Sequence, residues 1–176
     1  MHIMDIIQNS LGADAKVIRL EVEEDKEKDR LLIRVEDDGK GMDNGELRRV
    51  QDPFYTTKRE IGVGLGIPMF KWVAEHCGGG FEMKSVPGEG TTIEATFSLS
   101  HIDRPPLGDL PGTVLSTVIS NPDVRFIVKY KGKGEFFLDT QEIKETLDGV
   151  PLTSPAVIRF LKEYIGDGLK SVIEAA

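Results

Sequence analysis

Four short stretches of the chain carry residue types that suit nucleotide chemistry, and they follow one another in one order. They are D-I-I-Q-N (Asp5–Asn9), D-D-G-K-G-M (Asp37–Met42), G-V-G-L-G (Gly62–Gly66) and G-E-G-T (Gly88–Thr91). Each alone is weak evidence, because acidic and glycine-rich turns are common in loops. Their order and spacing together outline a pocket for a purine, a polyphosphate and a divalent cation.

Asp37 ends a run, Arg30 to Asp37, in which apolar and charged residues alternate, so it is expected at the end of a half-buried strand. An ionised carboxylate there could accept a hydrogen bond from the exocyclic amine of adenine. Gly39 and Gly41, followed by Met42, would let the backbone approach the base, where a side chain would collide. The alternative interpretation is an ordinary aspartate–glycine turn after a strand.

Asn9 offers an amide oxygen, which suits a hard magnesium ion that is held mainly by phosphate and water. Asp5 lies one helical turn earlier on the same face and could orient or deprotonate a nucleophile. Asp5 is therefore the candidate catalytic base. The alternative for both residues is a polar helix face in water.

The glycines of the third stretch, Gly62, Gly64 and Gly66, lead directly into an expected helix. The backbone N–H groups and the positive end of a helix suit a polyphosphate. Lys58 adds a cation four residues earlier, and Leu65 lies within the run. The stretch matches neither the P-loop pattern nor a dinucleotide-binding fingerprint, which needs a strand directly before it. A flexible turn is the alternative.

The bulk composition restricts the class of protein. A chain of 176 residues with 39% hydrophobic content can form one domain, or one domain with an appendage. Its formal net charge of -8 disfavours nucleic acid as a partner. No apolar run approaches the ~20 residues that span a bilayer, so we expect no membrane partner and a cytoplasmic location. Cys77 is the only cysteine, and the three histidines lack metal-ligand spacing.

The pattern of the first hundred residues predicts the elements that must position these side chains. Helical spacing of apolar residues predicts helices over 2–13 and 66–77, and Asp43 with Glu46 has the spacing of a capping box for a short helix to Gln51. Alternation predicts strands over 16–23, 30–37, 81–86 and 92–99.

The composition changes over residues 101–112, where three prolines and two glycines fall within twelve residues. We interpret this segment as a linker between a domain of residues 1–100 and an α/β appendage of residues 113–176. In the appendage we expect a helix over 113–119, a hairpin of 125–130 and 135–138, and helices that begin near Asp139 and at Pro155.

The chain resembles the ATP-binding domain shared by gyrase, heat-shock chaperones of the ninety-kilodalton class, sensor histidine kinases and MutL, known as the GHKL or Bergerat fold. The resemblance covers roughly residues 2–99 and is nearest to sensor histidine kinases. D-I-I-Q-N-S looks like the N box, V-E-D-D-G-K-G-M the first glycine box, D-P-F-Y-T-T-K the F box, G-V-G-L-G the second glycine box and G-E-G-T-T the third. It implies an α+β two-layer sandwich, a mixed sheet covered on one face by helices.

The resemblance also implies roles for the motif residues, with ATP and magnesium as cofactors. Asn9 would bind magnesium, and Asp37 the adenine amine. The base would lie against Gly39, Gly41 and Met42, and the phosphates against Lys58, Gly62, Gly64, Leu65 and Gly66, while Gly90 and Thr91 would close the pocket.

Three departures from the family pattern bear on activity. Sensor kinases carry a helical hairpin with a phospho-accepting histidine before the N box, which here begins at residue 2, so we expect none. Asp5 stands where MutL and gyrase have a glutamate, so we expect slow ATP hydrolysis or none. The segment Lys58–Gly62 is brief, so the loop that folds over ATP in many relatives is expected to be short.

These observations favour a stand-alone ATP-binding domain that acts in signal transduction. By resemblance to anti-sigma factors of the serine-kinase type and to histidine kinases, it could phosphorylate an unidentified protein partner. One alternative is a non-catalytic, nucleotide-gated interaction module, and another is a slow ATPase with Asp5 as base. Whether the chain is an enzyme stays open at this point, as does the role of residues 101–176.

Overall fold

The computed structural model describes residues 3–52 and 65–173. The strands of this part of the chain are β1 (Val17–Asp25), β2 (Arg30–Asp37), β3 (Gly80–Val86), β4 (Gly90–Ser98), β5 (Arg125–Lys131) and β6 (Glu135–Asp139). The helices are α1 (Ile3–Gly12), α2 (Asn44–Arg49), α3 (Gly66–His76), α4 (Leu110–Ser120), α5 (Thr140–Thr146) and α6 (Pro155–Val172).

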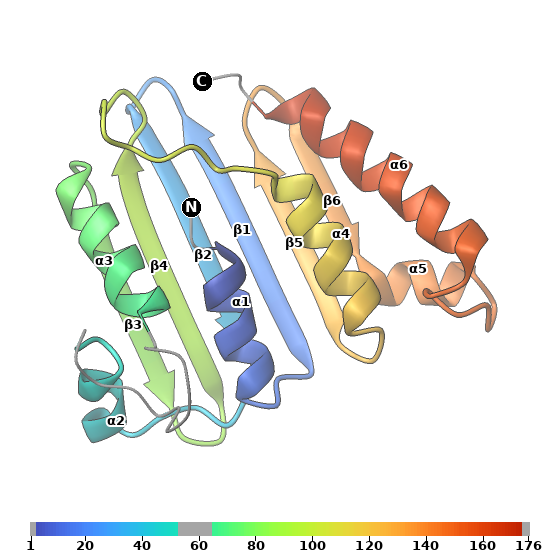
Figure 1. Cartoon of the computed structure of the whole chain (residues 1–176), viewed down its shortest axis with the longest axis horizontal. Helices are drawn as coiled ribbons and strands as arrows, with labels where there is room; N and C mark the ends of the chain where they lie inside the picture. Colours follow the sequence, from blue (N-terminus) through green and yellow to red (C-terminus); the bar gives the residue numbers. More distant parts are fainter. Residues whose placement is uncertain (1–2, 53–64, 174–176) are drawn as a thin grey trace.

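The strands form one mixed sheet in the order β3-β4-β2-β1-β5-β6 (Figure 1). Neighbouring strands are antiparallel except β1 and β5, which run parallel with Ile18 opposite Phe126. This parallel pair joins the strands of the first hundred residues to those that follow, and Arg125 N–H donates to Lys16 O at 2.8 Å where the pair begins. The sheet is therefore continuous through both parts of the sequence.

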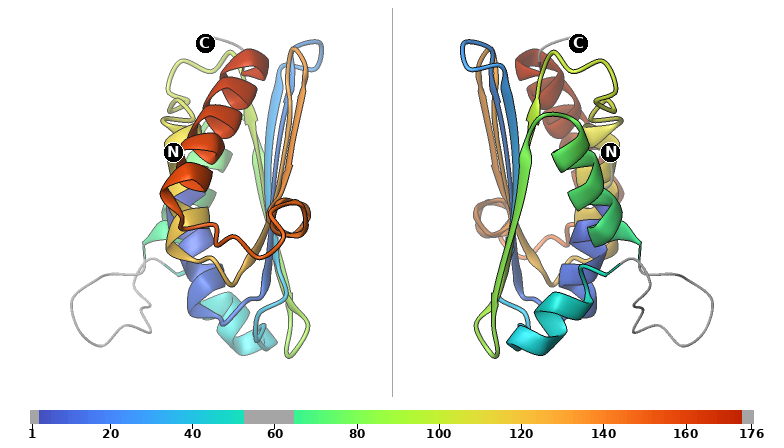
Figure 2. Two further views of the ribbon diagram at one scale, coloured as in Figure 1. Left: turned by 90° about the vertical axis from the view of Figure 1, so that its right-hand side faces the viewer. Right: turned by 90° about the vertical axis from the view of Figure 1, so that its left-hand side faces the viewer.

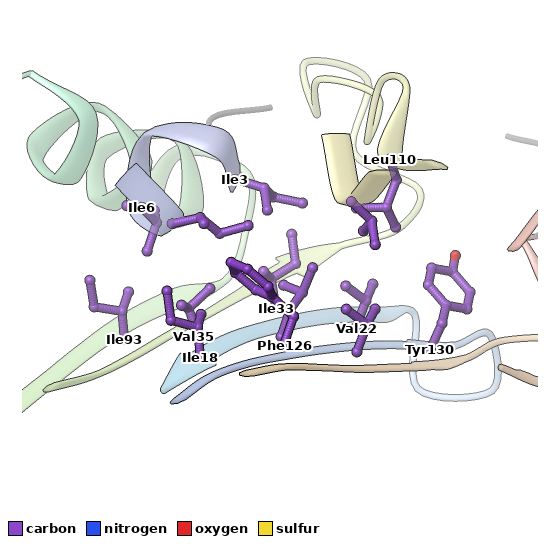
Figure 3. Close-up of a cluster of buried hydrophobic side chains, with 14 of the residues drawn as sticks. Ile3, Ile6, Ile18, Val22, Ile33, Val35, Ile93, Leu110, Phe126 and Tyr130 are labelled. Atoms are coloured by element: carbon purple, nitrogen blue, oxygen red, sulfur yellow. The ribbon is translucent and has the colours of Figure 1, made fainter. Parts of the chain in front are cut away.

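Helices α1, α3, α4 and α6 lie together on one face of the sheet (Figures 1 and 2). Apolar side chains of the strands point toward this layer, and Figure 3 shows Ile3 and Ile6 of α1 facing Ile18 and Ile33 of the sheet. The opposite face carries ion pairs instead, such as Arg34 with Glu94 and Glu21. The predicted two-layer α+β sandwich with helices on one face is confirmed.

The core crosses the predicted boundary between domain and appendage. One cluster of buried side chains includes Ile6 and Phe70 from the first part and Leu110, Tyr130 and Leu161 from the second. The second part therefore extends the sheet and the core of the first. The domain boundaries that we drew at residues 100 and 113 stay predictions.

The predicted elements agree with the structure to within a few residues, and the capping box of Asp43 with Glu46 is present at α2. The largest error is at α4, which we expected to begin at Thr113. It begins at Leu110, because the Asp109 side chain accepts a hydrogen bond from the backbone N–H of Gly112 and caps the helix three residues earlier. Pro111 in the first turn is compatible with this start, since its missing N–H has no helical partner there.

Candidate functional site

A cleft lies between α1, the loop after β2 and the beginning of β4. It encloses about 990 Å³ of space, including solvent at its mouth. Its wall is apolar at Ile6, Ile67, Met83 and Ile93, which come from four different elements. An apolar wall with a few polar groups is the usual form of a small-molecule site and suits the face of a purine ring.

Asp37 is the buried acid of this cleft, at the end of β2 and only 8% exposed. Its Oδ2 accepts a hydrogen bond from the hydroxyl of Ser10 at 2.6 Å. Its Oδ1 accepts one from the backbone N–H of Gly39 at 2.9 Å. Both oxygens are thus held by donors, and each keeps further capacity to accept a hydrogen bond from a ligand.

The glycines of the loop after β2 are required by contacts within the protein. Gly41 has φ +65°, and a Cβ on it would lie 1.9 Å from the carbonyl oxygen of Val86. A Cβ on Gly39 would lie 2.8 Å from the carbonyl oxygen of Ala13. The loop is therefore packed against the α1–β1 turn and the β3–β4 hairpin, which fixes one wall of the cleft. Contact of either glycine with a base stays a prediction.

Thr91 lies directly opposite Asp37 in the register of β2 and β4, and it is 9% exposed. Its hydroxyl is 2.9 Å from the hydroxyl oxygen of Ser85, which also accepts the backbone N–H of Met42 at 2.8 Å. Ser85 therefore ties Met42 in the loop to Thr91 in the strand. Met42 and Thr91 both line the cleft, together with Asp37.

Asn9 and Asp5 are exposed on α1, one helical turn apart. Asn9 lines the cleft, whereas Asp5 is not among the described residues of its wall. Asp5 lies instead at the first turn of α3, where a Cβ on Gly66 would be 2.8 Å from the Asp5 Cβ. Glycine at position 66 thus allows α1 and the beginning of α3 to approach closely.

The beginning of α3 is the place where the sequence predicts the phosphates, and this assignment stays a prediction. Leu65 stands at the N-cap position and contributes no side-chain hydrogen bond to the cap. The first N–H groups of a helix without such a cap can bind phosphate oxygens. The other predicted phosphate contacts, Lys58, Gly62 and Gly64, lie outside the described residues.

The sequence pattern missed three residues that shape the cleft. Asp38 accepts the backbone N–H groups of Lys16 and Val17 at 2.7 and 2.8 Å, which ties the loop after β2 to the beginning of β1. Ser85 and Ser10 are the others. A signal existed only for Ser10, a polar residue at the helical spacing of the apolar stripe on α1.

The described residues lack two further features. No three or more His, Cys, Asp and Glu side chains in residues 3–52 and 65–173 are grouped so as to hold a metal ion. No described helix has the length and apolarity that crossing a membrane requires.

Comparison with known proteins adds to this geometry. Residues 2–101 match the family model described as histidine kinase-, DNA gyrase B-, and HSP90-like ATPase. Sporulation kinase C of Bacillus subtilis is 30% identical over 96 residues, which is 54% of this chain and 22% of that protein.

Two other relatives match over a similar region. Sensor histidine kinase ZraS of Salmonella typhimurium is 37% identical over 65 residues, which cover 37% of this chain and 14% of that protein. The non-motile and phage-resistance protein of Caulobacter vibrioides is 30% identical over 111 residues, 58% of this chain and 13% of that protein. The chain thus spans less than a quarter of the length of each of these relatives.

Proposed function

The chain belongs to the histidine kinase-, DNA gyrase B-, and HSP90-like ATPase family, and we propose that its cleft binds ATP with magnesium and that the chain acts in regulation through a protein partner. The observation that carries the proposal is the buried carboxylate of Asp37, which has one protein donor on each oxygen and lines an apolar cleft. This arrangement supplies an acceptor, at a fixed depth, for the exocyclic amine of adenine.

Recognition of the base rests on what the cleft excludes as well as on what it binds. A carboxylate accepts hydrogen bonds from an amine and repels a carbonyl oxygen, so Asp37 favours adenine over a purine with oxygen at that position. The apolar side chains of Ile6, Ile67 and Ile93 would lie against the ring faces and exclude water from them.

Binding of the phosphates involves the two helix faces beside the cleft. Asn9 is exposed and lines the cleft, and its amide oxygen is the kind of ligand that magnesium takes in addition to phosphate and water. When bound, magnesium would neutralise charge on the phosphate oxygens. The N-terminal N–H groups of α3 would favour the same negative charge.

The γ-phosphate of the bound ATP has three possible fates, and transfer to another protein is the first candidate. Two of the relatives bear the names sporulation kinase and sensor histidine kinase, which supports transfer of the phosphate to another protein. In that reaction a side chain of the partner would gain the γ-phosphoryl group, and ADP would leave.

Slow hydrolysis is the second candidate, favoured by the position of Asp5 at the first turn of α3. A carboxylate there could accept a proton from an attacking water. A nucleotide-gated interaction module remains the third candidate, in which binding without chemistry shifts a conformation because ATP binds one state more tightly.

One experiment separates these candidates. Purified full chain is incubated with γ-labelled ATP, in magnesium or in EDTA, with and without extract of the source cell. Bound ATP, released phosphate and labelled protein are measured together. We expect magnesium-dependent binding and label on a second protein. Released phosphate without labelled protein would favour slow hydrolysis. Bound ATP that stays intact would favour the nucleotide-gated interaction module. Absence of binding would refute the assignment of the cleft as an ATP site.

A further inference from the structure

Ser10 is a polar residue at a core position. It lies at helical spacing from Ile3, Ile6 and Ile7, which form the buried stripe of α1, and it is 4% exposed. Burial of a hydroxyl costs free energy unless the hydroxyl is hydrogen-bonded. The structure therefore has to give the single proton of Ser10 an acceptor.

The acceptor is not on the helix itself. Serine within a helix commonly donates to the carbonyl oxygen four residues earlier, which here belongs to Ile6. The hydroxyl of Ser10 donates instead to Asp37 Oδ2 at 2.6 Å, across 27 positions of sequence. This distance lies in the range of strong hydrogen bonds between a hydroxyl and a carboxylate.

The bond determines how the carboxylate of Asp37 is oriented. The backbone N–H of Gly39 holds Oδ1 at 2.9 Å, so the two oxygens are held from two different elements, the loop after β2 and α1. The plane of a carboxylate is otherwise weakly constrained, because rotation about its terminal bond is broad. Without the Ser10 hydroxyl, the carboxylate keeps one anchor and can turn about it.

We propose that Ser10 is a positioning residue, which fixes the orientation of Asp37 and so sets the preference of the cleft for purines that carry an exocyclic amine. The proposal rests on the proposed function, that the cleft binds ATP. It also gives α1 two tasks, since Asn9 faces the phosphates and the next residue orients the group that recognises the base. Adjacent helical residues point in different directions, which makes this division geometrically natural.

The test is a thermodynamic cycle between the protein and the ligand. Dissociation constants of ATP and of purine riboside triphosphate, which lacks the amine, are measured by calorimetry in magnesium for wild type and Ser10→Ala. If Ser10 acts through Asp37 on the amine, Ser10→Ala raises the dissociation constant of ATP by about tenfold or more and leaves that of the analogue nearly unchanged. If the role of Ser10 is purely structural, the substitution raises the dissociation constants of both ligands by the same factor.

Three companion variants make the cycle decisive. Ser10→Thr keeps the hydroxyl and is expected to keep the preference for ATP. Ser10→Cys keeps a weak donor in a somewhat larger side chain, and it replaces Ser10→Ala if that variant does not fold. Thr117→Val is the matched control, because Thr117 is a buried helical hydroxyl that contacts Met4 of the same α1 but lies outside the described cleft wall.

The outcomes separate the inference from the proposed function. Wild type that binds neither nucleotide would overturn the proposed function, and the inference with it. If the wild type prefers ATP and Ser10→Ala weakens the binding of both ligands equally, the inference alone is overturned. Loss of the preference in Ser10→Thr or in Thr117→Val would also contradict it, since the first change keeps a hydroxyl for Asp37 and the second leaves Ser10 in place.

Discussion

At the scale of single residues, Asp37 joins two elements of the cleft. Its carboxylate is both the acceptor for the proposed adenine amine and the point where α1 and the loop after β2 meet. The backbone N–H of Gly39 can only donate to this carboxylate, whereas the Ser10 hydroxyl can donate or accept. An amide in place of the carboxylate would keep one oxygen as an acceptor and would turn its N–H₂ group toward one of these two neighbours.

Asp37→Asn is expected to reduce ATP affinity by about 10- to 100-fold, since hydrogen bonds to charged groups contribute roughly 1.5–3 kcal/mol each. Calorimetric titration with ATP measures the loss. Asp29→Asn is the matched control, because Asp29 accepts hydrogen bonds from Ser98 and Ser100 at the other end of the sheet. If Asp37→Asn binds ATP with the same affinity as Asp29→Asn, the Asp37 carboxylate does not take part in recognition of the base.

Asp5→Asn tests the candidate base. If hydrolysis uses the carboxylate, the variant loses turnover while it binds ATP with equal or higher affinity, because a negative charge beside the phosphates is removed. Phosphate release in single-turnover conditions and a parallel binding titration report the two quantities. Turnover that survives the change would assign the proton acceptance to another group or to solvent.

The motifs named five residues that lie together in the structure, although their roles stay predictions, and the sequence did not predict contacts between distant residues. Asn9, Asp37, Gly41, Met42 and Thr91, all named from the motifs, line one cleft. The bonds that hold them are long-range: Ser10 to Asp37 spans 27 positions, and Met42 to Ser85 spans 43. A local sequence pattern does not indicate which distant residues form such hydrogen bonds, because this depends on how the helices and strands pack together.

At the scale of elements, periodicity predicted which segments are helices and strands, because it reports which side of each segment is buried. It did not predict that β5 pairs in parallel with β1. Alternation describes a half-buried strand equally well beside either neighbour and in either direction. The structure shows this pair in register, with α4 packed against α6 on the shared face and with α5 capped directly after β6.

Asp139 shows how one such cap is held. Its carboxylate accepts Arg125 Nη2 at 2.6 Å and Nε at 3.1 Å, joining β5 to β6, and it caps α5 by accepting the N–H of Gln141 at 2.9 Å. The side chain is 4% exposed. The Arg125 guanidinium holds the pKa of Asp139 below its usual range.

Asp139→Asn is expected to lower the free energy of unfolding by about 1–3 kcal/mol at pH 7. Because the folded pKa is lowered, the contribution of Asp139 is fully present above its unfolded pKa of about 3.9 and is lost as pH falls through the folded pKa. Urea unfolding of wild type and variant should therefore converge in acid. Asp25→Asn, which breaks an exposed pair with Lys28, should change stability less. A gap between Asp139→Asn and wild type that persists below the folded pKa would contradict this account.

At the scale of the whole molecule, the open question is whether residues 1–100 and 113–176 unfold separately. A linker rich in proline and glycine predicted two units. The continuous sheet and the shared buried cluster favour one, because removal of β5 would uncover the edge of β1 and part of its apolar face. The two views differ in a measurable way.

Leu161→Ala provides the measurement. Leu161 is 0% exposed in α6, and its truncation should cost about 2–5 kcal/mol through lost burial and a residual cavity. Trp72, the only tryptophan, lies on α3 within the first hundred residues, so its fluorescence reports on that part of the chain. If the molecule is one cooperative unit, the urea midpoint seen by Trp72 falls together with the midpoint seen by far-ultraviolet circular dichroism. If α6 belongs to a separate domain, the urea midpoint seen by Trp72 stays where it is in wild type.

A shift of both midpoints would mean that the residues beyond the ATP-binding motifs contribute to the stability of the cleft itself, since any state that binds ATP would then include them.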